Sequence, residues 1–136
     1  MDLSAARTFL EDHHRAVLVT TRADGRPQLS PVVVGLDDDG AACISTREPA
    51  MKVRNVRRRP RVSLCVLDDA FTGPWIQVDG TAEVVELPGA MERLVDLYRR
   101  IRGEHPDWDE FRAAMARERR VVLRVRLESA GPDRSG

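Results

Sequence analysis

The chain has 136 residues, and its content of 42% hydrophobic and 32% charged residues is typical of one globular domain that buries its own core. Its 22 basic and 22 acidic residues balance at pH 7, so no net field attracts the chain to nucleic acid or to an anionic membrane. We therefore expect no nucleic-acid partner and no membrane partner.

Hydropathy and cysteine usage indicate the compartment. No apolar run approaches the roughly 20 residues of a membrane span, and the first residues lack the pattern of a signal peptide. Cys43 and Cys65 both lie inside apolar, strand-like runs, which favours reduced core residues over a disulfide or a metal site. We expect a cytoplasmic protein.

A short helix is expected at the start of the chain. Ser4 can cap it, Phe9 and Leu10 belong to its apolar side, and it should end near His13 and His14. Adjacent histidines without a third ligand at helical spacing are a weak metal signal. We therefore expect no metal site here.

Two strands should follow as a hairpin. Residues 16–21 form a continuous apolar and β-branched run, which is typical of a strand buried on both faces. A turn at residues 23–25 leads into a second strand over residues 26–36. This strand contains Pro27 and Pro31, which cannot donate to a hydrogen-bond ladder, so it must be an edge strand or a bulged one.

The second strand also presents polar side chains. Gln28 and Ser30 are two residues apart and share one face of the strand. Such an edge would offer polar groups and unpaired carbonyls to a flat ligand. A plain barrel edge without a ligand is an equally good interpretation of this stretch.

A third strand over residues 41–46 should lead into a central helix. Pro49 can open this helix, because its missing N–H costs nothing in a first turn, and Pro60 ends it. Lys52 and Asn55 are three residues apart and share a face of the helix.

Composition singles out this pair. Lys52 is the only lysine among 22 basic residues, and Asn55 is the only asparagine. Lysine is a compact point charge, whereas arginine is a wide planar fork. A lysine kept in an arginine-rich chain suggests a phosphate held at a helix N-terminus, although an ordinary solvated lysine remains the alternative.

The second half of the chain predicts two strands, two helices and a final strand. The strands cover residues 62–67 and 75–86, with a bulge or bend at Gly80. The helices run from Pro88 to Gly103 and onward from Asp107, whose spacing to Glu110 is a capping signal. Trp108, Phe111 and Met115 of the last helix are expected to be buried core residues. A strand over residues 121–127 should close one domain of residues 1–128, followed by a disordered tail of residues 129–136.

Five or six strands joined by tight hairpins favour an antiparallel barrel over a parallel sheet. The chain contains no nucleophile elbow, no phosphate-binding Gly-rich loop and no dinucleotide fingerprint. We therefore expect no catalytic side chain, and any chemistry should come from a bound cofactor.

Four parts of the chain carry a family resemblance. They comprise residues 18–21 with 24–30, residues 48–55 with 58–63, Trp75 with residues 80–83, and residues 103–105 with 107–109 and 119–123. The Asp-Gly-Arg-Pro-Gln strand and the Lys-x-x-Asn helix are the specific motifs. The chain resembles the flavin and deazaflavin split-barrel proteins related to pyridoxamine 5′-phosphate oxidase, and is most similar to their actinobacterial branch, which uses coenzyme F420.

The resemblance implies a mainly β protein with flanking helices: a six-stranded antiparallel split β-barrel that works as a homodimer, with cofactor sites at the subunit interface. It implies that Lys52 holds the cofactor phosphate with help from Ser45, Thr46 and Asn55. Trp75 would contribute to the site of the other subunit. The tricyclic ring would lie along the strand residues Arg26, Pro27, Gln28, Leu29, Ser30 and Pro31.

The implied function is an oxidoreductase that passes hydride between reduced F420 and a conjugated organic acceptor. FMN-dependent redox chemistry and a flavin or F420 carrier without turnover are the alternatives. Relatives often carry a basic residue where this chain has Ala50, so Arg47, Arg54 or Arg57 would have to hold the glutamyl tail of F420. Loops such as residues 68–74 are expected to shape the acceptor pocket.

Overall fold

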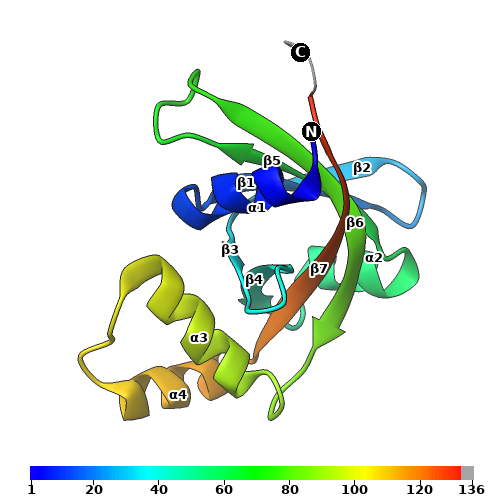
Figure 1. Cartoon of the computed structure of the whole chain (residues 1–136). Helices are drawn as coiled ribbons and strands as arrows, with labels where there is room; N and C mark the ends of the chain where they lie inside the picture. Colours follow the sequence, from blue (N-terminus) through cyan, green and yellow to red (C-terminus); the bar gives the residue numbers. More distant parts are fainter. Residues whose placement is uncertain (133–136) are drawn as a thin grey trace.

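Within the described residues, 1–132, the computed structural model has seven strands in one antiparallel sheet that curls into a split barrel flanked by four helices (Figure 1). The elements are α1 (Leu3–Asp12), β1 (Arg15–Thr21), β2 (Pro27–Val33), β3 (Gly35–Leu36), β4 (Ala42–Arg47), α2 (Met51–Arg58), β5 (Arg61–Leu67), β6 (Trp75–Val85), α3 (Met91–Arg102), α4 (Trp108–Arg117) and β7 (Arg120–Gly131).

β2 and β3 are consecutive in the chain but lie at opposite ends of the sheet, whose order is β2-β1-β5-β6-β7-β4-β3. Val34 donates its N–H to the carbonyl of His14 at 2.8 Å, and Gly35 then pairs with Cys43 of β4. The predicted single strand over residues 26–36 is therefore two strands, because the chain changes partner after β2. If β2 and β3 are counted as one strand, the sheet has the six strands expected.

The main core fills the barrel. β1 and β5 alternate fully buried with half-buried residues, so only one face of each strand is fully buried, contrary to the expectation for residues 16–21. α1 and α2 add apolar side chains to this core, among them Leu10 and Val53. Burial of each such aliphatic side chain contributes roughly 1.5–3 kcal/mol.

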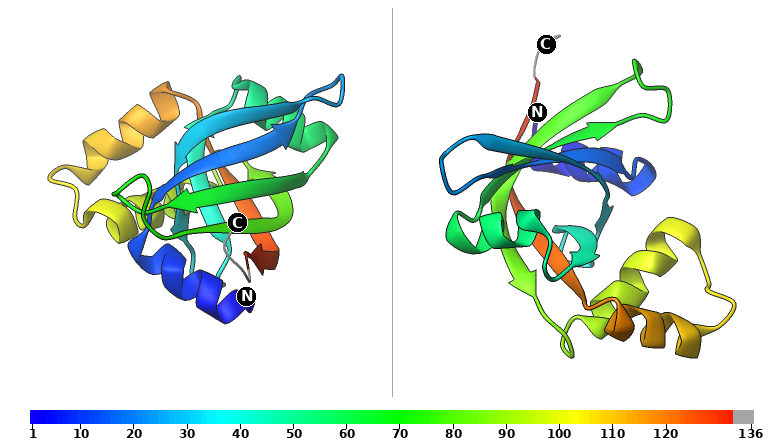
Figure 2. Two further views of the ribbon diagram at one scale, coloured as in Figure 1. Left: turned by 90° about the horizontal axis from the view of Figure 1, so that it is seen from above. Right: turned by 180° about the vertical axis from the view of Figure 1, so that it is seen from behind.

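The helices α3 and α4 form a hairpin with a second, smaller core. Leu94, Val95 and Phe111 pack there against Cys43 and Val122 of the sheet. Figures 1 and 2 show α2 and the α3–α4 hairpin on either side of β4. The space above the end of β4 is thereby enclosed from two directions.

Several predicted local features are confirmed. The register between β6 and β7 shifts at Gly80, as expected for a bulge. Gly103 ends α3 with a φ of 82°, a conformation that glycine adopts without steric cost. Asp107 caps α4 by accepting the N–H of Glu110 at 3.1 Å.

The helix starts differ from expectation. Asp2, and not Ser4, caps α1, because its carboxylate accepts the N–H of Ala5 at 2.7 Å. Pro49 lies before the N-cap of α2 and not in its first turn, since α2 begins at Met51.

The end of the last strand also differs. β7 continues to Gly131, and its residues 129–131 pair with residues 77–79 of β6. The expected disorder from Ser129 is therefore wrong for residues 129–131, since β6 is long enough to pair with them. The remaining tail, residues 133–136, lies outside the described residues.

Candidate functional site

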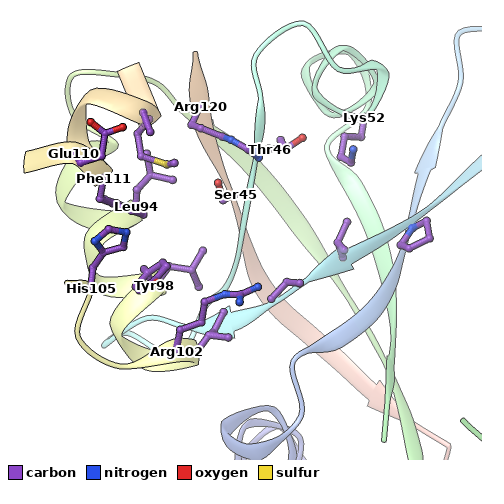
Figure 3. Close-up of a pocket in the computed structure, with 17 residues that line it drawn as sticks. Ser45, Thr46, Lys52, Leu94, Tyr98, Arg102, His105, Glu110, Phe111 and Arg120 are labelled. Carbon is purple, nitrogen blue, oxygen red and sulfur yellow. The ribbon is translucent and has the colours of Figure 1, made fainter. Parts of the chain in front are cut away.

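A groove of about 870 Å³ lies at the split of the barrel (Figure 3). Residues 31–33, at the exit of β2, and Ser45 and Thr46, at the end of β4, form its sheet side. Lys52 of α2 stands at one end, and apolar side chains of α3 and α4 form the opposite wall. The groove thus combines a cationic, polar corner with an apolar wall.

The polar corner forms where the chain leaves β4 and enters α2. Ala50 occupies the N-cap of α2 without a side-chain hydrogen bond, and the first turn contains no acidic residue. Free N–H groups at such a helix start attract anions. Lys52 is half-buried and has no ion pair or hydrogen bond to any side chain within residues 1–132. Its ammonium and the helix start together suit a phosphate or another anionic group.

Ser45 and Thr46 both line the groove, but as neighbours in a strand they leave opposite faces of β4, and the hydroxyl of Thr46 lies on the side of Lys52 (Figure 3). Pairing of β4 with β7 places Ser45 opposite Val122 and Thr46 opposite Val121. Neither hydroxyl hydrogen-bonds to another residue of the described chain. The hydroxyl of Thr46 can donate toward the corner, whereas the expected contribution of Ser45 stays a prediction.

Other charges near the corner are already balanced. Arg120 lines the groove, but its Nε and Nη2 donate to Oε1 of Glu118 at 3.1 and 2.8 Å, and this hydrogen bonding lowers the pKa of the Glu118 carboxyl. Glu48 accepts from Arg57 at 3.0 Å and from Arg119 at 3.1 Å, and the Arg57 bond is the main cause of its lowered pKa. Both carboxylates are engaged by arginines, which leaves the ammonium of Lys52 uncompensated.

Asn55 lies on α2 with Lys52, but its side chain points into the protein interior. It is fully buried, and its Nδ2 donates to Oγ1 of Thr20 and to Oε1 of Gln28, each at 3.0 Å. Its Oδ1 accepts from Nη2 of Arg58 at 2.6 Å. Asn55 therefore joins α2 to β1 and β2, and in this way helps to position Lys52.

β2 is an edge strand, as its two prolines predicted. Val34, just after β2, donates its N–H to the carbonyl of His14, just before β1. Since hydrogen-bonded residues alternate along an antiparallel pair, the even-numbered residues of β2 are the ones that form the ladder with β1. The odd-numbered residues, from Pro27 to Val33, turn their backbone groups to the open edge. The two prolines therefore remove no ladder hydrogen bond.

Of the six expected ring-contacting residues, only Pro31 and Gln28 line a hollow, and they line different ones. Pro31 lines the groove, whereas Gln28 lines a second hollow together with Asn55. Arg26 bonds Asp24 at 2.9 Å, and Leu29 is 63% exposed. Pro27 is exposed and Ser30 half-buried, and neither lines the groove.

Trp75 lies away from the groove of its own chain. It begins β6, is 40% exposed, and lines a separate hollow with Asp79 and Ser129. Its expected contribution to the site of a second subunit therefore stays a prediction. Residues 68–74, expected to shape the acceptor pocket, do not line the groove either.

The sequence interpretation missed the α3–α4 wall. Phe111 and Met115, expected only as core residues, both line the groove, whereas Trp108 packs behind it. Further groove-lining residues come from α3 and the loop after it: Leu94, Leu97, Tyr98, Ile101, Arg102 and His105. The sequence offered no separate signal for this wall, because the apolar positions of α3 have the ordinary spacing of one core-facing helix.

No cluster of three or more His, Cys, Asp or Glu side chains within residues 1–132 could hold a metal ion. His13 and His14 instead contact the backbone carbonyls of Phe9 and Val34, at 2.8 and 2.9 Å. Among the helices of this part of the chain, none has the length and apolarity to cross a bilayer.

Comparison with known proteins identifies related folds. Among solved structures, a conserved hypothetical protein from Mycobacterium tuberculosis is 26% identical, with a TM-score of 0.76 over 96% of this chain and 82% of that one. A structure named F420 reductase is 24% identical, with a TM-score of 0.71 over 92% and 94% of the two chains. The heme storage protein HutZ from Vibrio cholerae is 18% identical, with a TM-score of 0.69 over 96% and 94% of the two chains.

A family model described as pyridoxamine 5′-phosphate oxidase matches residues 3–131. The match covers nearly all of the split barrel and both walls of the groove. The chain therefore belongs to the pyridoxamine 5′-phosphate oxidase family.

Proposed function

We propose that the protein is an F420-dependent oxidoreductase that passes hydride between the reduced deazaflavin and a conjugated organic acceptor. The observation that carries this proposal is the polar corner of the groove, where the unpaired ammonium of Lys52 stands at the uncapped start of α2. The named likeness to an F420 reductase, over 94% of that chain, agrees with it.

The residues of the corner fit the phosphate of such a cofactor. Lys52 would neutralise it, the first N–H groups of α2 would bond its oxygens, and Thr46 would donate from the end of β4. The open edge of β2 would lie along the ring. The bound deazaflavin would supply the hydride, so the chain needs to position its ligands and to exclude water, without an acid–base pair of its own.

The glutamyl tail of F420 requires further cations. Arg47 and Arg57, two of the three candidates, are paired with Glu118 and with Glu48. Arg54 is exposed and unpaired within residues 1–132, and it lines the second hollow with Arg22 and Arg58. We assign the tail to this hollow, because Met51 and Arg54 of α2, which line it, are close in sequence to Lys52, which lines the groove.

FMN is the second candidate cofactor, because its single phosphate needs only the corner at Lys52 and leaves the arginine hollow unused. A carrier that binds F420 or FMN without turnover is the alternative outside enzymes. We further propose that the protein acts in the cytoplasm as a homodimer.

Titration of the purified protein with F420 and with FMN tests the cofactor, using deazaflavin and flavin fluorescence. We expect tighter binding of F420, and Arg54→Ala should lower the affinity for F420 while leaving that for FMN unchanged. Oxidation of reduced F420 by an added enone or quinone separates an enzyme from a carrier. Tighter binding of FMN would replace the F420 proposal, and the absence of binding of either cofactor would end it.

A further inference from the structure

The apolar wall of the groove contains one fixed hydrogen-bond donor, His105. It lies in the loop between α3 and α4 and lines the groove opposite Lys52 (Figure 3). The backbone N–H of Asp107 donates to its Nδ1 at 2.9 Å. Because Nδ1 accepts this hydrogen bond, the neutral imidazole carries its proton on Nε2.

Neighbouring rings fix the orientation of His105. Its ring centroid lies 5.1 Å from that of Tyr98, 5.5 Å from that of Phe111 and 5.6 Å from that of Trp108. Trp108 is itself held by a hydrogen bond from its Nε1 to Glu104 at 2.9 Å. Nε2 of His105 has no hydrogen-bond partner within residues 1–132, so its N–H is oriented and unused.

Tyr98 is the other half-buried donor on this wall. Its hydroxyl also lacks a partner in the described chain, but a hydroxyl hydrogen rotates freely. The N–H of His105 is held in one direction by the bond at Nδ1 and by three rings. A preorganised donor loses less entropy when it binds a ligand.

We propose that the α3–α4 wall is the binding site of the hydride acceptor, a flat apolar molecule with a conjugated carbonyl whose oxygen accepts a hydrogen bond from Nε2 of His105. The apolarity follows from the lining of Leu94, Leu97, Ile101 and Phe111, and a conjugated carbonyl compound is flat by its own bonding. The carbonyl follows from the fixed N–H of His105, whereas Arg102, which also lines this wall, is exposed. Only the identification of this molecule as a hydride acceptor depends on the proposed function.

The test compares two ligands in the cofactor-free protein. The ketone 1-tetralone and the hydrocarbon tetralin share a bicyclic frame, and only the ketone can accept a hydrogen bond. The chain has 2 tryptophans, so its ¹⁵N spectrum contains two indole signals. Both ligands should shift the signal of Trp108 and leave that of Trp75 in place, and 1-tetralone should bind about three- to tenfold more tightly.

Three variants assign the donor. In His105→Asn the amide oxygen can replace Nδ1 as the acceptor for Asp107, but no donor remains at the position of Nε2. We expect this variant to bind tetralin normally and to lose the preference for 1-tetralone. His105→Gln, which restores an N–H near Nε2, should regain the preference, and Tyr98→Phe should keep it.

Three results would overturn this assignment. If His105→Asn kept the full preference, or if Tyr98→Phe abolished it, His105 would not be the donor. If neither ligand moved the Trp108 signal, the α3–α4 wall would not be the acceptor site. Since no cofactor is present, these outcomes are independent of whether F420 or FMN binds at Lys52.

Discussion

Lys52 is the residue for which composition and structure agree. The only lysine of an arginine-rich chain lines the groove and has no ion pair within residues 1–132. A planar guanidinium spreads its charge over five donors, whereas an ammonium places one compact charge on a phosphate. The identity of the cation at this position should therefore matter as well as its charge.

Substitution of Lys52 tests this. Lys52→Ala removes a charge-assisted contact of about 1.5–3 kcal/mol, so cofactor affinity should fall roughly ten- to more than a hundredfold. Lys52→Arg should also weaken binding, whereas folding should change by less than about 0.5 kcal/mol in both variants. Fluorescence titration gives the affinities. Wild-type affinity in Lys52→Arg would contradict the role assigned to the single lysine.

Asn55, the only asparagine, stabilises the fold, because its side chain links α2 to β1 and β2. Asn55→Ala leaves buried Thr20 and half-buried Gln28 short of a hydrogen bond, which should lower the free energy of unfolding by about 1–3 kcal/mol. Arg54→Ala, on an exposed position of the same helix, is the matched control and should change it by less than about 0.5 kcal/mol. Urea denaturation measures both, and equal effects of the two substitutions would argue against the structural role of Asn55.

Among the elements, the long β6–β7 ladder depends on one glycine. A Cβ at Gly80 would lie 2.1 Å from the backbone oxygen of Arg126, and no rotamer change can relieve a backbone contact. The bulge at this point bends the two strands and so helps to curl the sheet. The barrel shape thus rests partly on a residue without a side chain.

Gly80→Ala should therefore destabilise the protein by about 1–3 kcal/mol or more, through overpacking against the neighbouring strand. Gly89→Ala is the control, since its Cβ would meet only the oxygen of Glu86 at 3.5 Å, an ordinary contact. Thermal unfolding of both variants measures the difference. Equal melting temperatures would show that β7 can shift at the bulge at little cost.

At the scale of the whole molecule, the described chain leaves several large apolar side chains exposed. Leu29 is 63% exposed, Val33 44% and Trp75 40%. A second copy would cover such residues, and stable interfaces bury about 1,200–2,000 Å² in total. The proposed homodimer accounts for this exposure and for the distance of Trp75 from the groove of its own chain.

Two measurements test the dimer. Sedimentation at micromolar concentration should give one dimeric species, and a strictly monomeric protein would contradict the proposal. Trp75→Ala should keep the dimer but weaken cofactor binding, by roughly 1–3 kcal/mol if the indole stacks on the ring as aromatics stack on bases. Unchanged affinity would mean that Trp75 only packs at the surface.

Local signals in the sequence determined much of this protein. Apolar runs, turn residues and prolines predicted an antiparallel barrel with β2 at an edge, and the spacing of Gly80, Gly103 and Asp107 marked a bulge, a helix end and a cap. These features depend on the conformational preferences of single residues and their neighbours. The same holds for Lys52, whose place at a helix start could be read from the residues around it.

The tertiary structure alone decided how distant segments meet. It divided residues 26–36 between two sheet edges, because closing the barrel requires a change of partner after β2. It turned Asn55 inward, since a helix has several faces and spacing does not say which one packs on the barrel. It also brought His105 and the α3–α4 wall opposite Lys52, more than 40 positions away in the sequence. The spacing of apolar residues predicts that a side chain is buried, but not which element or ligand buries it.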